Sequence, residues 1–114
     1  RFVSSKESPV HSNFKDSIIS SPIDGTLILN KKSKPVIRAI KTDLTNKIDE
    51  EGVMDMSALM KIKDLYFGGD MNAAPALSGQ SVGLIDKVKS VDEIITTTIS
   101  EYNEVCKRLS TSQF

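Results

Sequence analysis

Glycine is concentrated in residues 68–85, and it limits what this stretch of the chain can form. Four of the six glycines lie there, together with Pro75. The Gly68-Gly69 pair ends the preceding segment, and Asp70 or Asn72 can cap a helix that holds Pro75 in its first turn. The pattern therefore predicts a glycine-bearing helix.

Two glycines of this expected helix, Gly79 and Gly83, are four residues apart and therefore share one helix face. Each glycine inside a helix costs roughly 0.5 to 1 kcal/mol relative to alanine. The spacing therefore indicates that something approaches this face closely. A neighbouring helix or strand and a bound ligand both satisfy the pattern.

Capping residues predict two shorter helices and two strands elsewhere. One helix runs from Ser8-Pro9 to about Ser20, and another begins at Thr42 or Asp43 and ends near Gly52. The strands are two short apolar runs on either side of a polar, basic turn, so they form a hairpin-like antiparallel pair. They span Thr26–Leu29 and Pro35–Ile40.

The last helix has the clearest pattern. Residues Ser90–Glu93 follow the capping-box sequence. A one-sided apolar stripe follows, made of Val91, Ile94, Ile95, Ile99, Tyr102, Val105, Cys106 and Leu109. Cys106 is the only cysteine, so the chain has no internal disulfide, and we expect it to pack in the core of a cytoplasmic protein.

Charge and residue types exclude several classes of function. Lysine plus arginine and aspartate plus glutamate number 15 each, so neither nucleic acid nor an anionic membrane is the expected partner. No apolar run approaches the ~20 residues that a membrane span needs. With one cysteine and one histidine, His11, the chain has no zinc-type cluster and no nucleophile–histidine–acid set. We expect His11 to cap a helix or lie on the surface.

Several segments occur in a characteristic order. They are Arg1–Val3, Lys6–Ser8, His11, Asn13, Lys15 and Ile18, then Ile23-Asp24, Thr26, Val36–Lys41 and Leu44-Thr45, and finally Gly69-Asp70, Ser78–Ile85 and the last helix. In this order they resemble the C-terminal third of the FMN-dependent nitronate monooxygenase (2-nitropropane dioxygenase) and enoyl-acyl-carrier-protein reductase II family. The resemblance runs nearly end to end and is weakest over residues 49–67.

The resemblance implies an α/β fold, the C-terminal fragment of a flavin-binding TIM barrel with a small inserted α/β lobe. That lobe is helix-rich and has one short antiparallel strand pair. Residues 1–22 would end barrel strand 8 and form the following helix. Residues 23–67 would form the inserted lobe, and residues 68–114 would return to the barrel and form the C-terminal helices.

The resemblance also implies FMN, bound mostly by residues upstream of this chain. Arg1 would follow a Gly-Thr pair that holds the FMN phosphate, and Ser78, Gly79 and Gln80 would lie near the flavin. Leu77 would line the substrate pocket. Reductases of the family tend to have Met-Ala-Gly-Gln where this chain has Leu77-Ser78-Gly79-Gln80. The family's catalytic histidine lies upstream, so no catalytic residue is expected here.

The implied function is the C-terminal portion of an FMN-dependent oxidoreductase that acts on a nitronate or reduces an enoyl thioester, with NAD(P)H as a possible substrate. The chain begins Arg-Phe-Val, without methionine, and we interpret it as a fragment. We expect the remaining N-terminal barrel as partner, or self-association, and no activity or FMN in the isolated chain. The alternative is a free-standing α/β interaction module without catalytic activity.

Overall fold

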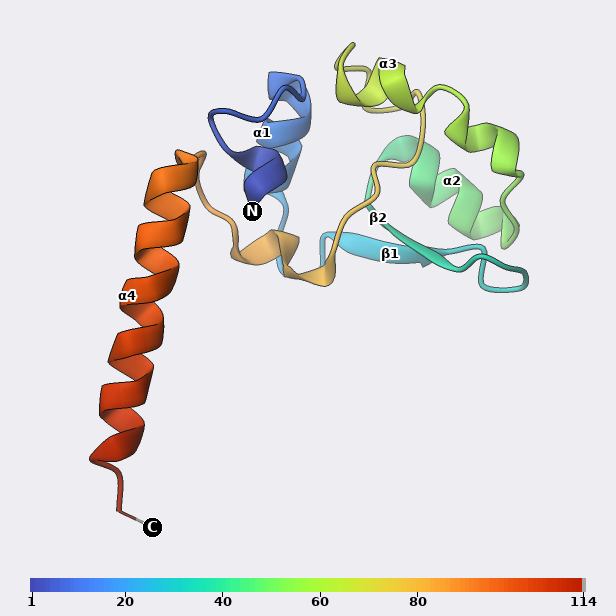
Figure 1. Cartoon of the computed structure of the whole chain (residues 1–114). Helices are drawn as coiled ribbons and strands as arrows, with labels where there is room; N and C mark the ends of the chain where they lie inside the picture. The colour runs from blue at the N-terminus through green and yellow to red at the C-terminus, as the bar shows by residue number, and fades with distance from the viewer. Residues whose placement is uncertain (114) are drawn as a thin grey trace.

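The computed structural model describes residues 1–113. It has a body of short elements, from which one long helix projects (Figure 1). In chain order the elements are η1 (Phe2–Ser4), α1 (Ser12–Ser20), β1 (Thr26–Leu29), β2 (Ile37–Ile40), α2 (Asp43–Glu51), η2 (Met56–Leu59), α3 (Ile62–Tyr66), η3 (Gln80–Leu84) and α4 (Val91–Ser110), where η marks a 3₁₀ helix.

The two strands pair as the sequence predicts. β1 and β2 are antiparallel, with Thr26 opposite Ile40 and Leu29 opposite Ile37. One face of the pair packs against α2 in a small buried cluster. That cluster consists of Leu29, Ala39, Ile48 and Met54.

The predicted boundaries of α2 are confirmed, since the helix spans Asp43–Glu51 between the caps Thr42 and Gly52. Thr42 and Thr45 form a reciprocal capping box, in which each side chain accepts the other residue's backbone N–H. At the other end Gly52 adopts a left-handed conformation with φ 77°, which a glycine reaches without steric cost.

The predicted start of α1 at Ser8-Pro9 is wrong, since the helix begins at Ser12. His11 is the N-cap, and its Nδ1 accepts the backbone N–H of Asn13 at 3.0 Å. The backbone N–H of His11 donates to the Tyr66 carbonyl instead of continuing a helix. The capping role expected for His11 is therefore confirmed.

The predicted helix over the glycine-rich stretch is also wrong. Only Gln80–Leu84 is helical, as the short 3₁₀ helix η3. The residues before it run along the edge of β2: Ile40 N–H donates to the Ala76 carbonyl at 2.9 Å, and Ser78 N–H donates to the Arg38 carbonyl at 3.1 Å. This pairing, with Leu77 opposite Ala39, holds the segment extended and overrides its local helix pattern.

The close approach expected at the two glycines occurs at one of them. A Cβ on Gly83 would lie 2.5 Å from Ile23 Cα and 2.6 Å from the Pro22 carbonyl oxygen. The approaching group is therefore the neighbouring turn of the chain. A Cβ on Gly79 would meet nothing nearer than Ser81 Oγ at 4.0 Å, so no close approach exists there.

The larger buried cluster joins α1, β2, α3 and the stretch that leads to η3. Its members are Phe14, Ile18, Ile40, Leu65, Ala74, Ala76 and Val82. The cluster contains residues from all three predicted segments, 1–22, 23–67 and 68–114, so these segments share one core. The predicted boundaries between the segments stay a prediction.

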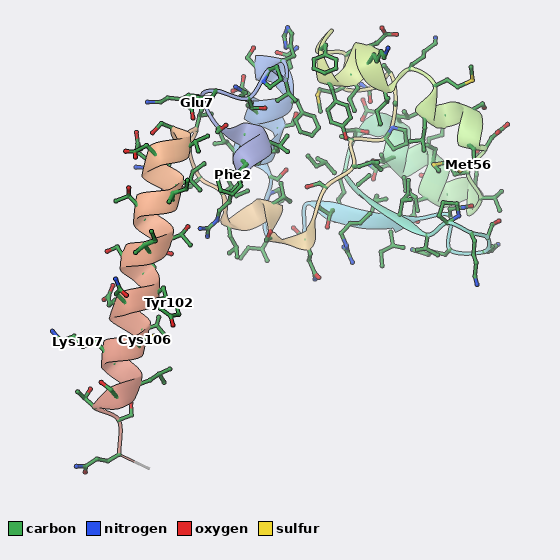
Figure 2. The ribbon with its side chains drawn as sticks, viewed as in Figure 1. Phe2, Glu7, Met56, Tyr102, Cys106 and Lys107 are labelled. Carbon is green, nitrogen blue, oxygen red and sulfur yellow. The ribbon has the colours of Figure 1, made fainter. Side chains whose placement is uncertain are left out.

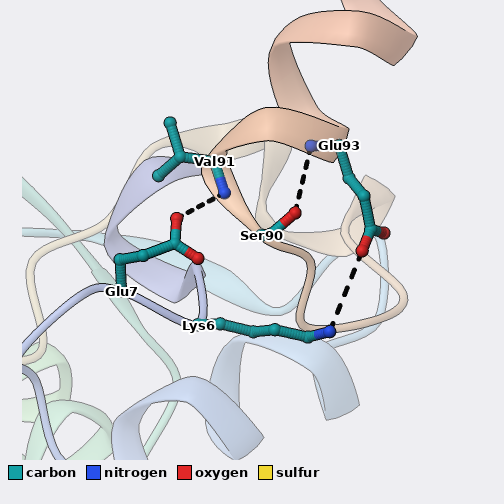
Figure 3. A network of polar contacts seen from close by, with 5 residues as sticks. All are labelled: Lys6, Glu7, Ser90, Val91 and Glu93. Carbon is teal, nitrogen blue, oxygen red and sulfur yellow. Dashed lines mark hydrogen bonds and ion pairs between the residues drawn. The ribbon is translucent and has the colours of Figure 1, made fainter.

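The start of α4 is tied to the N-terminal segment (Figure 3). Ser90 Oγ accepts the backbone N–H of Glu93 at 3.1 Å, which confirms half of the predicted capping box. The Glu93 carboxylate does not complete the box but lies 3.8 Å from Lys6 Nζ. Glu7 supplies a further cap, because its carboxylate accepts the backbone N–H of Val91.

The apolar stripe of α4 is largely uncovered. Ile94 is buried, but Ile99 is 56% and Tyr102 is 68% exposed. Cys106 is exposed as well, so its predicted core packing is wrong for residues 1–113, which provide no element over this face. Figure 2 shows Tyr102 and Cys106 on one side of α4 and Lys107 on the other. None of the helices in the described chain is both long and apolar enough to span a membrane.

The two glycines give a matched test of this packing. Gly83→Ala should lower the free energy of unfolding by about 1–3 kcal/mol, because its Cβ would clash with backbone atoms that cannot move independently. Gly79→Ala should change it by no more than about 0.5 kcal/mol. Urea unfolding followed by circular dichroism measures both, and equal effects would contradict the placement of Gly83.

Candidate functional site

A pocket of about 430 Å³ lies beside α1, the end of α3 and residues 77–85. A volume of this size is within the range of small-molecule sites. Its walls are mainly apolar, with side chains from Val10, Phe14, Ile18, Tyr66, Val82 and Ile85.

Four of the five predicted site residues meet at this pocket. Arg1, Leu77, Ser78 and Gly79 all line it, although Arg1 comes from the opposite end of the sequence. Gln80 is exposed and does not line the pocket. The structure thus brings most of the predicted set together, and the binding of FMN by these residues stays a prediction.

The pairing with β2 positions the rim of the pocket. The two hydrogen bonds that flank Leu77 fix its backbone against Ala39, so the next residues leave the sheet edge at a defined place. Gly79 then begins η3 with an ordinary φ of −77° and an exposed backbone. Glycine here leaves the rim without a side chain.

Tyr66 is a pocket residue that the sequence pattern did not single out. It ends α3, and its ring packs edge-on against Phe14 at 4.9 Å between ring centroids. Burial raises the pKa of the Tyr66 phenol, and a hydrogen bond with the Leu77 backbone offsets part of that rise. The available signal in the sequence was the aromatic pair Tyr66-Phe67 directly before Gly68-Gly69.

A smaller pocket of about 200 Å³ lies between the N-terminal segment and α4. Arg1 lines both pockets. The smaller one also holds Lys87, Lys89, Asp86 and Glu101, so its charges are mixed and favour neither an anion nor a cation. Within residues 1–113 no group of three histidine, cysteine, aspartate or glutamate side chains could hold a metal ion.

The larger pocket suits one side of a flat aromatic cofactor such as FMN. Its apolar walls match a ring system, and Arg1 supplies a permanently charged group of the kind that binds phosphate. The described residues give this pocket walls but too few polar groups to hold the whole cofactor. Apolar walls with few polar groups agree with a site to which residues outside this chain contribute the remaining polar contacts.

Comparison with solved structures gives first a structural class: a helix-rich domain with one antiparallel strand pair that is similar to a portion of a larger protein. The protein to which it is similar is FabK from Thermotoga maritima. The chain matches FabK with a TM-score of 0.87 and 30% identity, covering 96% of this chain and 37% of FabK. Its M276A mutant matches with a TM-score of 0.83 and 31% identity, covering 96% of this chain and 34% of the mutant.

The chain therefore spans about a third of the length of the proteins it matches. FabK is an enoyl-acyl-carrier-protein reductase II, so the match confirms the resemblance drawn from the sequence for this part of FabK. No protein-family model and no curated protein sequence matches the chain.

The raised pKa of Tyr66 predicts a loss of stability in alkali. A group whose pKa is raised on folding contributes stability that is present below its unfolded pKa and is lost as the pH rises through the folded value. Unfolding free energy should therefore fall above pH about 10, and fall less steeply in Tyr66→Phe. Denaturation at a series of alkaline pH values tests this. Tyr102→Phe is the matched control, and identical alkaline slopes in wild type and Tyr66→Phe would contradict it.

Proposed function

We propose that this chain is the C-terminal portion of an FMN-dependent oxidoreductase of the nitronate monooxygenase and enoyl-acyl-carrier-protein reductase II type, and that it closes the flavin and substrate pocket. One observation carries the proposal. Arg1, Leu77, Ser78 and Gly79, which the family resemblance assigns to the site, line a single pocket in a chain about 30% identical to FabK.

In this proposal the chain helps to bind the cofactor and to enclose the substrate, while the catalytic groups lie in the upstream part of the enzyme. FMN, when bound, supplies the transfer of electrons or hydride. Arg1 contributes positive charge toward the cofactor phosphate, and the side-chain-free rim at Gly79 admits the cofactor closely. Leu77, beside the apolar walls, excludes water from the substrate.

The proposed partner is the remaining N-terminal barrel. Five exposed residues of α4 follow one another at spacings of four and three, which aligns them along one side of the helix. They are Ile95, Ile99, Tyr102, Cys106 and Leu109. An apolar face of this length favours burial against another structure. The barrel wall is the surface that the family resemblance offers.

Flavin retention tests the proposal. The 114-residue chain alone should lose FMN on gel filtration, because most of the cofactor's contacts lie outside it. A chimaera in which the chain replaces the matching third of Thermotoga maritima FabK should retain FMN and oxidise NAD(P)H with an enoyl thioester, or oxidise a nitronate. Visible absorbance reports the flavin. FabK lacking that third is the control, and a yellow isolated chain would contradict the proposal.

A charge on the α4 stripe tests the proposed partner. Ile99→Asp should leave the unfolding free energy of the isolated chain within about 0.5 kcal/mol, because Ile99 is 56% exposed. In the chimaera the same change should cost several kcal/mol, because a carboxylate would be buried without a partner. Ser100→Asp, on another side of α4, is the matched control. Equal effects of Ile99→Asp in both proteins would exclude the stripe as the contact.

A further inference from the structure

The start of α1 is joined to the end of α3 by three contacts, which together form the α1–α3 corner. The backbone N–H of His11 donates to the Tyr66 carbonyl at 2.6 Å. The side-chain amide of Asn13 donates to the Gly69 carbonyl at 2.9 Å. The third contact is the His11 ring, which lies so close to Gly69 that a Cβ there would be 2.6 Å from His11 Cε1. His11 therefore takes part in two of the three contacts.

The cap of α1 fixes the chemical state of the His11 ring. Nδ1 accepts the backbone N–H of Asn13 at 3.0 Å, so Nδ1 carries no proton and the neutral ring has its proton on Nε2. Protonation of Nδ1 would turn the acceptor into a donor that faces another donor. It would also put a positive charge at a helix N-terminus, where positive charge is unfavourable. Only the neutral His11 ring can therefore cap α1.

No ion pair balances a charge on the His11 ring within residues 1–113. The carboxylates of Glu7 and Asp70 each accept the backbone N–H of another residue, Val91 and Asn72 respectively. An imidazolium at this position would therefore have no ion-pair partner. The charged or titratable side chains on the segments around the ring are Glu7, Lys15, Asp16, Lys63, Asp64, Tyr66 and Asp70.

The α1–α3 corner holds walls of the larger pocket. Tyr66 lines that pocket, and so does Val10, which directly precedes His11. Phe14 is a third lining residue: its backbone N–H donates to the His11 carbonyl at 3.0 Å, and its ring lies edge-on against Tyr66. The His11 side chain does not line the pocket. It acts on the pocket only through the residues beside it.

We propose that His11 is a positioning residue of the pocket, whose neutral ring keeps α1 against α3 so that Phe14 and Tyr66 stay together as adjoining walls. Protonation of Nδ1 removes the cap, loosens the corner and weakens binding in the pocket. Histidine is the side chain whose charge ordinarily changes between pH 5 and 8, so the effect falls in that range. The effect on the corner is independent of the ligand, whereas its effect on substrate affinity rests on the proposed function.

NMR of the 114-residue chain tests the state of the corner. At pH 7.5 the ¹⁵N shifts of the single histidine should show the Nε2–H tautomer. From pH 7.5 to 5.5 the exchange protection of the His11 amide should fall about fivefold, and the NOEs between the Phe14 and Tyr66 rings should weaken. The Ile40 amide, which bonds to the Ala76 carbonyl, is the internal control and should change less than twofold. An Nδ1–H tautomer, or unchanged protection of His11, would overturn the inference.

His11→Asn is the matched variant, because asparagine also caps helices but does not titrate. Protection of the residue 11 amide should be equal at both pH values in His11→Asn and low at both in His11→Ala. The terminal amine and Cys106 are present in every variant, so a pH effect common to all would not belong to His11 and would overturn the inference. Should His11→Ala fail to fold, the comparison of wild type with His11→Asn decides alone.

The FabK chimaera carries the test to the substrate. Its KM for S-crotonyl-N-acetylcysteamine should rise about fivefold more between pH 7.5 and 5.5 in wild type than in His11→Asn, while kcat changes equally in both. An equal change of KM in the two proteins would overturn the positioning role. An inactive chimaera, with the NMR results as expected, would overturn only the proposed function.

Discussion

Two backbone hydrogen bonds between residues 76–78 and the edge of β2 organise most of this chain. They draw an extended segment across the body and bury Ala74 and Ala76 in the larger core. They also fix Leu77 opposite Ala39 at the sheet edge, and they place Gly79 at the rim of the pocket. Without this pairing the four predicted site residues would have no common location.

The orientation of α4 depends on fewer and weaker contacts. Ile94 is buried, but the polar contacts at the first turn of α4 are exposed (Figure 3). They are the hydrogen bonds of Glu7 with Val91 and of Ser90 with Glu93, and the ion pair of Lys6 with Glu93. Exposed ion pairs contribute roughly 0–1 kcal/mol each, and a cap about 1 kcal/mol. The helix is therefore fixed at one end only, and its apolar stripe is the part of the described chain that most favours a partner.

Elements with local signals could be predicted from the sequence. The strand pair, the capping box of α2 and the start of α4 depend on residues within a few positions of one another. The glycine-rich stretch could not be predicted in this way, because its structure depends on hydrogen bonds to strand residues nearly 40 positions away. The same limit applies to the start of α1, where the N–H of His11 bonds to Tyr66.

The geometry of the candidate site could not be predicted from the sequence. Family resemblance named Arg1, Leu77, Ser78 and Gly79, which line one pocket, and Gln80, which lies outside it; their role in binding stays a prediction. Tyr66 has no motif around it, and only the folded structure shows that it lines the pocket. Glycine spacing predicted a close approach correctly at Gly83 and wrongly at Gly79, since the assumed helix is absent.

Thiol accessibility of Cys106 tests most directly the central claim that this chain completes a larger barrel. The thiol is the only one in the chain, and it lies exposed on the α4 stripe. Maleimide labelling, followed peptide by peptide with mass spectrometry, should be fast in the isolated chain and at least about tenfold slower in the FabK chimaera. A Ser100→Cys, Cys106→Ser variant should label equally fast in both. Equal labelling of Cys106 in both proteins would contradict the claim.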